Sequence, residues 1–169
     1  MYVYAEGGYS VNQYDTMLDA ALTSYEELYK IDKSYQETIV DLRKRKGWRY
    51  IVKSQCDDAI NILESAYALN EQTVSSYLSH AYNQKAYDYV QNEDYDDALS
   101  VIEKAIALMP EVADYYDSKG EILLKLGDAQ GALEMWHKVL ELEPEFLSSF
   151  PEGTELYNGL KQKGLITEE

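Results

Sequence analysis

Two residues in the chain have the spacing that metal ligands take in helical bundles. Glu134 and His137 form an E-x-x-H pattern, which places a carboxylate and an imidazole one helical turn apart. A di-metal site of this kind needs a second copy, but the only other histidine, His80, follows Tyr77 at that spacing. Because the neighbouring Trp136 should be buried, His137 should face solvent. We predict that the chain holds no metal and needs no cofactor.

The sequence also lacks patterns that support nucleophilic or phosphate chemistry. Cys56 is the only cysteine, which excludes an internal disulfide and a multi-cysteine metal site. Neither a G-x-S-x-G turn nor a G-x-x-x-x-G-K-[ST] loop occurs. We therefore predict that the chain is not an enzyme.

The charge of the chain limits its partners. A formal net charge of −16 repels nucleic acid and anionic membranes, and no apolar run is long enough to span a bilayer. We predict no nucleic-acid partner and no membrane insertion. The charge either attracts a basic protein partner or only solvates the helix surfaces. The first residues do not form a signal peptide, so we expect a soluble protein, cytoplasmic by default, or exported if a signal has been removed.

One basic cluster interrupts this acidic chain. It comprises residues 43–46, with the sequence RKRK, and extends to Arg49 and Lys53. These side chains could neutralise carboxylates on a neighbouring helix or contact a partner, and both interpretations stay open.

The elements that must position these residues repeat along the chain. The stretch LGDAQGALEMWHKVLELEP, from Leu126, follows the pattern of NEDYDDALSVIEKAIALMP, from Asn92, with an offset of 34 residues. A repeat with this period indicates an array of stacked helical hairpins. The two copies align Asp94 with Asp128, Ala98 with Ala132, Lys104 with Lys138, and Pro110 with Pro144.

Each copy predicts two antiparallel helices. In residues 79–112, apolar side chains recur every three or four residues in both halves, with a short polar turn between them. The next copy covers residues 113–146, and a third fits residues 40–73, with residues 74–78 extending the following helix. Small residues should lie where helices cross, because they let two backbones approach closely. They are Gly47, Ala86 and Gly120 at one repeat position, and Ala59, Ala98 and Ala132 at another.

This pattern resembles the tetratricopeptide repeat (TPR) family. The family has a unit of 34 residues, with Gly or Ala at the eighth position, Ala at the twentieth, a large apolar residue at the twenty-fourth and Pro at the thirty-second. Here Tyr82 and Tyr116 occupy the fourth position and Trp136 the twenty-fourth. The upstream copy departs from the pattern, with Arg43 in place of the fourth-position aromatic and Glu71 in place of the proline.

The resemblance implies an all-α fold, a right-handed superhelical solenoid of antiparallel helical hairpins. Residues 1–9 should form an N-terminal tail, and residues 10–39 a helix that makes an irregular hairpin with the next. The apolar stripes predict helices over residues 11–31 and 35–53, with Ser34 and Glu37 as a capping box for the second. Residues 40–146 would form the three repeats, and residues 147–169 a C-terminal capping helix and tail.

The resemblance also implies where a ligand would bind. In TPR proteins the first helix of each hairpin lines the concave face, and repeat positions two, five, six, nine and thirteen point into it, although an ordinary solvated surface is the alternative here. In the third copy these positions hold Asp114, Asp117, Ser118, Glu121 and Lys125. A clamp for a C-terminal carboxylate is not expected, because Lys44 alone fits that arrangement. The predicted groove consists of Lys44, Arg45, Trp48, His80, Asn83, Gln84, Tyr87, Gln91, Asp114, Asp117 and Glu121.

These observations predict a non-catalytic scaffold that binds a peptide or protein segment in the groove. The acidic end of the partner would meet the basic residues of the first repeat, and its basic end the carboxylates of the third. Trp48 and Tyr87 would be the anchors. The alternative is a structural or self-assembly module, either a homo-oligomer or part of a larger assembly protein. The seventeen tyrosines suit both, since a tyrosine ring can pack while its hydroxyl stays in water.

Overall fold

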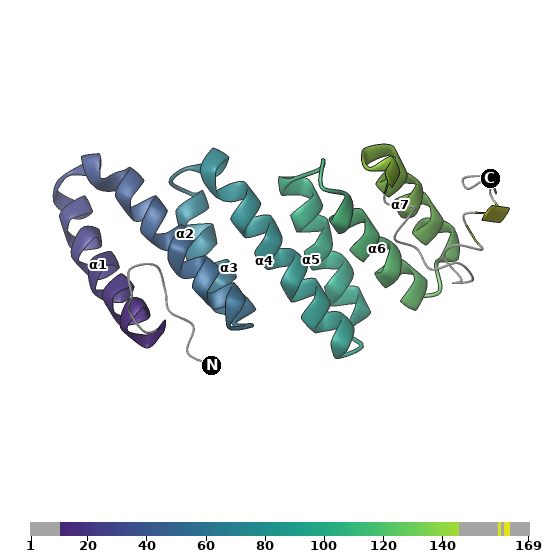
Figure 1. Ribbon diagram of the computed structural model, residues 1–169, viewed down its shortest axis with the longest axis horizontal. Helices are drawn as coiled ribbons and strands as arrows, with labels where there is room; N and C mark the ends of the chain where they lie inside the picture. The colour runs from purple at the N-terminus through teal and green to yellow at the C-terminus, as the bar shows by residue number, and fades with distance from the viewer. Residues whose placement is uncertain (1–10, 146–158, 160, 163–169) are drawn as a thin grey trace. The chain divides into compact units, whose positions relative to one another are not determined.

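The computed structural model describes residues 11–145, 159, 161 and 162. The regular elements among these residues are all helices, without a strand, as Figure 1 shows. The all-α prediction is confirmed. The helices are α1 (Val11–Ile31), α2 (Gln36–Val52), α3 (Cys56–Tyr67), α4 (Glu71–Gln91), α5 (Tyr95–Leu108), α6 (Ala113–Lys125) and α7 (Ala129–Leu142), and a 3₁₀ helix, η1, covers Lys33–Tyr35.

The helix boundaries follow the sequence patterns closely. Helix α1 has the predicted bounds, and α4 runs for 21 residues without a break, so residues 74–78 do extend it. The capping box predicted at Ser34 and Glu37 is wrong. Ser34 lies in η1, and its backbone N–H donates to the carboxylate of Asp32 at 2.9 Å. Asp32 therefore caps the turn that reverses the chain between α1 and α2, and α2 begins at Gln36.

The chain divides into two compact units, residues 1–81 and 82–169, with the boundary inside α4. In the first unit, α2 packs against both α1 and α3. In the second, α6 packs against both α5 and α7. The core between α6 and α7 contains Ala113, Ala132, Trp136 and Val139, which are buried and covered by partly buried leucines.

Ion pairs join α1 to α2 and engage most of the basic cluster. From Asp15 to Glu26 along α1, the paired cations run backwards along the chain, from Lys53 to Arg43. Antiparallel helices require this order. Four cations of the cluster therefore neutralise carboxylates on the neighbouring helix, which is one of the two interpretations given above. The pairs are Asp15 with Lys53 (2.6 Å) and Arg49 (2.8 Å), Asp19 with Lys46 (2.5 Å), and Glu26 with Arg43 (2.9 Å).

Arg43 also accounts for the departure of the upstream repeat from the family pattern. It stands where an aromatic residue is expected, and its guanidinium Nη1 donates to the carbonyl of Ser65 on α3 at 3.0 Å. Together with its bond to Glu26, this contact places one side chain against three helices. The arginine thus replaces the packing of a ring with hydrogen bonds.

The glycines at the helix crossings are required by close approach. A Cβ added to Gly47 would lie 2.5 Å from Cγ of Leu63, and one added to Gly120 would lie 2.7 Å from Nε1 of Trp136. Both distances are too short for real contacts, so the predicted close crossings are confirmed. The alanines at the other small position, Ala59, Ala98 and Ala132, are fully buried.

The three turns between paired helices close with the same hydrogen bonds. After α6, the N–H of Gly127 donates to Leu124 (3.0 Å) and that of Asp128 to Leu123 (2.9 Å). This is a Schellman motif, which places one residue in the left-handed region, here Gly127 at φ +85°. The corresponding residues after α2 and α4 are not glycines but Ser54 (φ 57°) and Glu93 (φ 63°).

The predicted N-terminal tail lies outside the described residues, and so does most of the predicted C-terminal capping helix. Of that helix, Gly159, Lys161 and Gln162 are helical. A Cβ added to Gly159 would lie 2.9 Å from Cδ2 of Leu133, so this piece of chain lies against α7.

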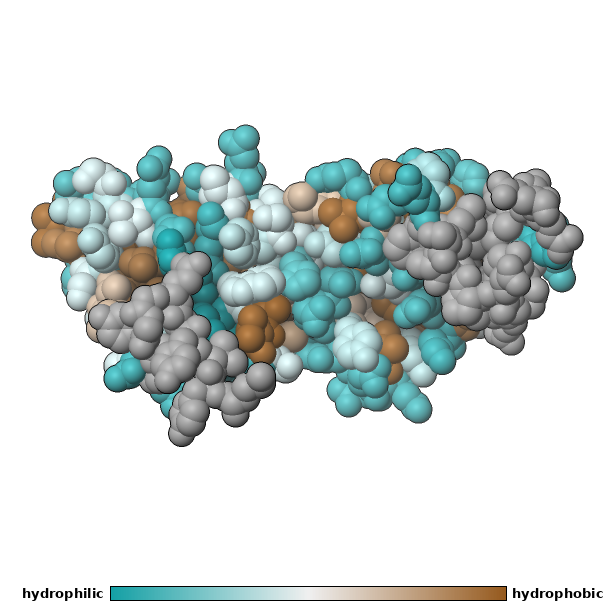
Figure 2. All heavy atoms as spheres, viewed as in Figure 1, coloured by the Kyte–Doolittle hydropathy of each residue, from teal (hydrophilic) through white to brown (hydrophobic). Residues whose placement is uncertain are grey.

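The face of the molecule drawn in Figure 2 is mostly hydrophilic where residues are described. Figure 2 shows polar residues over most of one face, with apolar residues in separate patches. Within the described residues, no helix combines the length and the apolar character needed to cross a bilayer.

Candidate functional site

In the first unit, three predicted groove residues lie together with a fourth that the sequence analysis missed. Trp48 on α2 is 45% exposed and stacks on His80 of α4, with ring centroids 5.6 Å apart. The ring of Tyr77 meets Trp48 edge-on at 6.5 Å, and Nζ of Lys44 lies 5.2 Å from the centre of the Tyr77 ring. Lys44, Trp48, Tyr77 and His80 are here termed the aromatic surface.

Tyr77 was missed because it precedes the predicted start of its repeat. It lies in residues 74–78, which the repeat register treats as an extension of the helix. The signal that could have found it is its spacing, since Tyr77 and His80 are three residues apart and share one face of α4.

Arg45, another predicted groove residue, is engaged on its own helix. Its Nε donates to the carboxylate of Asp41, one turn earlier on α2, at 2.7 Å. This hydrogen bond raises the pKa of Arg45 above its ordinary value. Both side chains are about half exposed, so the pair is a surface ion pair.

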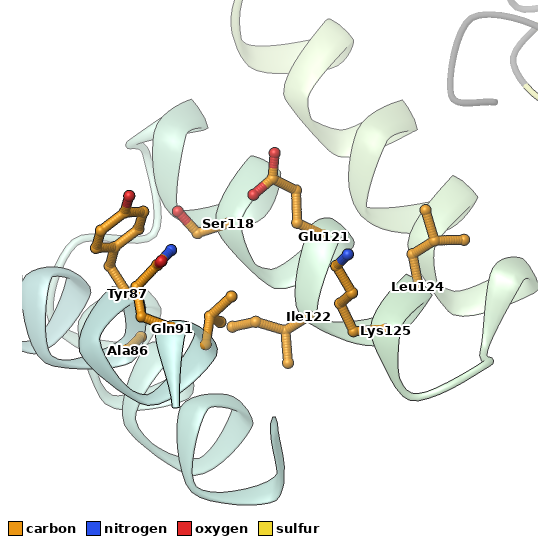
Figure 3. Close-up of a pocket in the computed structure, with 9 residues that line it drawn as sticks. Ala86, Tyr87, Gln91, Ser118, Glu121, Ile122, Leu124 and Lys125 are labelled. Atoms are coloured by element: carbon orange, nitrogen blue, oxygen red, sulfur yellow. The ribbon is translucent and has the colours of Figure 1, made fainter. Parts of the chain in front are cut away.

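In the second unit, a pocket of about 410 Å³ lies between α4 and α6. Figure 3 shows Tyr87 and Gln91 on one side, and Ser118, Glu121 and Lys125 on the other. These five residues occupy repeat positions predicted to face a ligand. The α4–α6 pocket is lined by Ala86, Tyr87, Val90, Gln91, Ser118, Glu121, Ile122, Leu124 and Lys125.

The α4–α6 pocket has an apolar lining with a polar rim. Ala86 and Ile122 are buried, and Val90 and Leu124 are half-buried beside them. Tyr87 is 60% exposed, an unusual degree of exposure for so large a ring. The amide, hydroxyl, carboxylate and ammonium groups around it offer both donors and acceptors. Such a pocket can hold an aliphatic chain while binding its polar end.

Asn83 and Gln84 precede this pocket on α4 and are half-buried. The side-chain oxygen of Asn83 is buried and accepts no hydrogen bond from the described part of the chain. An acceptor left in this state lowers the stability of the fold. A hydrogen bond donated to this oxygen by water or by a ligand would therefore be favourable.

The three predicted carboxylates on α6 do not share one role. Asp114 and Glu121 are exposed, whereas Asp117 is half-buried and accepts a hydrogen bond from the indole N–H of Trp136 at 3.0 Å. Burial raises the pKa of Asp117 to about 6, and repulsion from Glu121 and Asp114 acts in the same direction. The bond from Trp136 opposes this shift. Asp117 thus also stabilises the packing of α6 on α7.

The E-x-x-H pattern on α7 does not bring its two residues together. The carboxylate of Glu134 accepts from Gln130 at 3.0 Å, and Nδ1 of His137 lies 3.3 Å from Glu141. His137 is half-exposed, so its prediction as an outward-facing residue is confirmed. The described residues contain no group of three or more side chains that could hold a metal ion.

One stretch of the chain matches a known family of repeats. Residues 83–138 match a family model described as tetratricopeptide repeat. The crystal structure of MamA is 23% identical and covers 96% of this chain and 88% of its own, with a TM-score of 0.52. The NMR structure of the first TPR domain of the human RPAP3 protein is 22% identical and covers 76% of this chain and 97% of its own, with a TM-score of 0.50. These likenesses show a shared fold. No curated protein matches the sequence.

Proposed function

Because the chain carries tetratricopeptide repeats at residues 83–138, we propose that it is a non-catalytic scaffold that binds a peptide or protein segment through the first helices of its hairpins. The observation that carries this proposal is the α4–α6 pocket. Five of its lining residues stand at the repeat positions predicted to face a ligand. A pocket formed there by folding supports the use of these positions for binding.

The chemistry of the α4–α6 pocket suits a peptide. Gln91 and Ser118 can pair with backbone N–H and C=O groups, which every peptide offers regardless of sequence. Tyr87 supplies a large and rigid contact with little loss of conformational entropy. The apolar lining would bury part of a side chain and add affinity by removing it from water.

The aromatic surface offers a second contact. Trp48 keeps nearly half of its area in solvent although its ring is already stacked on His80. A ring held in place this way loses little freedom when a partner covers it, and tryptophan is frequent at binding hot spots. Lys44 adds a positive charge at this surface, which favours an acidic residue of the partner.

The test is a screen of arrayed peptides against the full chain, followed by affinity measurements on the peptides selected. Replacing both Asn83 and Tyr87 by alanine should abolish binding at the α4–α6 pocket, and Trp48→Ala should test the aromatic surface independently. Circular dichroism should show unchanged helical content. Glu134→Ala, on an exposed position of a second helix, is the matched control. Undiminished binding by both surface variants would move the site elsewhere.

Self-assembly is the second candidate, favoured by an apolar stripe on α1. Met17 (53%), Leu28 (40%) and Ile31 (86%) are exposed on one face of the helix, and Figure 2 shows apolar residues at the surface over α1. Light scattering over a wide range of dilution tests this candidate. A dimer that persists in the wild type and disappears in Ile31→Glu would support it, and a monomer at every concentration would reject it.

A further inference from the structure

We propose that the α4–α6 pocket accepts the side chain of an arginine or lysine from the partner. This inference rests on the proposed function, because it names the class of residue recognised at one of the proposed contacts. It depends on the shape of the pocket, on Tyr87, and on the charge along α6.

The shape of the pocket fits a long side chain with a charged end. Its walls are formed by Ala86, Val90, Ile122 and Leu124, and its polar groups lie at the rim. Arginine and lysine carry three or four methylene groups that pack against apolar surface while the charged end stays near water. A short acidic side chain could not bury comparable apolar area there.

Tyr87 and Glu121 supply partners for a cation from two different helices. Figure 3 shows them on opposite sides of the pocket, on α4 and α6. The exposed face of the Tyr87 ring can bind a guanidinium or ammonium group through its negative π-surface. The carboxylate of Glu121 can form an ion pair with the same group. A cation bound between them would make both contacts.

The charges along α6 favour a cation at the Glu121 end of the pocket. Asp114, Asp117 and Glu121 recur at spacings of three and four residues, so they share one face of the helix. Lys119 is engaged elsewhere, in an ion pair with Glu103 of α5 at 2.7 Å. Burial raises the pKa of Asp117 to about 6, and repulsion from Glu121 and Asp114 acts in the same direction.

Lys125 makes the two ends of the pocket differ in charge. It lies one turn after Glu121 and is the only cation among the described residues that line the pocket. Lys125 and Gln91 would therefore receive an oxygen of the partner, from a backbone carbonyl or an acidic side chain. This places the basic residue of the partner at the Glu121 end and excludes it from the Lys125 end.

The test uses three blocked pentapeptides, Ac-Gly-Ala-X-Ala-Gly-NH2, in which X is arginine, citrulline or glutamate. Amide chemical shifts of the full chain are followed during titration up to about 10 mM, because a single side-chain contact gives weak binding. The arginine peptide should shift amides of residues 86–91 and 118–125. Citrulline keeps the shape of arginine without its charge, and should bind about fivefold more weakly.

Two neighbouring substitutions of opposite sign complete the test. Glu121→Gln should weaken binding of the arginine peptide about threefold, and Lys125→Gln should strengthen it by a similar factor, since each removes one charge from the pocket. Glu111→Gln, in the exposed loop before α6, is the control and should have no effect.

Equal shifts with all three peptides would overturn the inference while leaving peptide binding at the pocket intact. The absence of any shift would also overturn the inference. The proposed function fails on a different result, namely that peptides selected from the array bind the Asn83→Ala/Tyr87→Ala double variant and the Trp48→Ala variant as tightly as the wild type.

Discussion

The indole N–H of Trp136 donates a 3.0 Å hydrogen bond to the carboxylate of Asp117, joining α7 to α6. The ring is only 3% exposed and lies over Gly120, where a Cβ would not fit. This hydrogen bond therefore connects a carboxylate of the predicted groove to the close crossing of α6 and α7 at Gly120. Changes on either side of this bond should affect the stability of the repeat.

Asp117→Asn is expected to stabilise the protein at neutral pH. The folded-state pKa of Asp117 is raised to about 6 from 3.8, so the stability it contributes is fully present below pH 3.8 and lost as the pH rises through 6. Ionisation at neutral pH thus costs at most about 3 kcal/mol. Asparagine cannot ionise and still accepts the bond from Trp136. Thermal unfolding should show a higher Tm for the variant at pH 7.5 and little difference near pH 4. An equal difference at both pH values would contradict this explanation.

Gly120→Ala should destabilise the second unit. The new methyl group would lie 2.7 Å from Nε1 of Trp136, and overpacking of this kind typically costs about 1–3 kcal/mol. The same substitution should become stabilising in a Trp136→Leu background, because the obstacle is removed and alanine favours a helix by about 1 kcal/mol over glycine. Urea denaturation of the four proteins measures both effects. A loss of stability that persists after Trp136→Leu would show that the indole is not the cause.

The left-handed residues in the turns should respond in opposite directions to glycine and alanine. Glu93→Gly should stabilise the protein by about 1 kcal/mol, since glycine adopts φ +63° without strain, and Gly127→Ala should destabilise it by a similar amount. Urea denaturation again provides the measurement. Glu93→Ala is the control, because it removes the charge but keeps the strain. If it stabilised the protein as much as Glu93→Gly, the backbone explanation would fail.

Asp15→Asn should weaken the contact between α1 and α2 in a pH-dependent way. The hydrogen bond from Arg49 lowers the pKa of Asp15, and the hydrogen bond from Lys53 lowers it further. Burial raises this pKa, but by less than the bond from Arg49 lowers it. A lowered pKa gives stability that is present above pH 3.8 and lost as the pH falls through the folded-state value. We expect a loss of about 1 kcal/mol at pH 7, measured by urea denaturation, because Asp15 and Arg49 are both only 20% exposed.

The comparison at low pH decides whether this ion pair is responsible. As the pH falls through the lowered folded-state pKa of Asp15, the wild type and Asp15→Asn should converge in stability, because protonation removes the same charge that the substitution removes. Asp41→Asn is a matched control, since its partner Arg45 lies on the same helix and the pair is more exposed. A difference between wild type and Asp15→Asn that stays constant with pH would assign the effect to packing.

The sequence determined the helices, because their signals are local. Apolar residues recur at three and four residues in each helix, and this spacing depends only on the helical turn. The offset of 34 residues between copies then required successive hairpins to pack in the same way. That is why the repeat alone predicted Gly47 and Gly120 at close crossings, without indicating that Leu63 and Trp136 occupy the space beside them.

The tertiary structure decided which side chains meet across helices. Tyr77 joins Trp48 and His80 at the aromatic surface, Asp117 bonds to Trp136, and Arg45 pairs with Asp41. Repeat position gives the direction of a side chain to within one helix face. The partner it finds depends on the rotamers and on residues of another helix, and no spacing within a single helix encodes these. The fold was therefore predictable in outline, whereas the roles of individual groove residues required the packed structure.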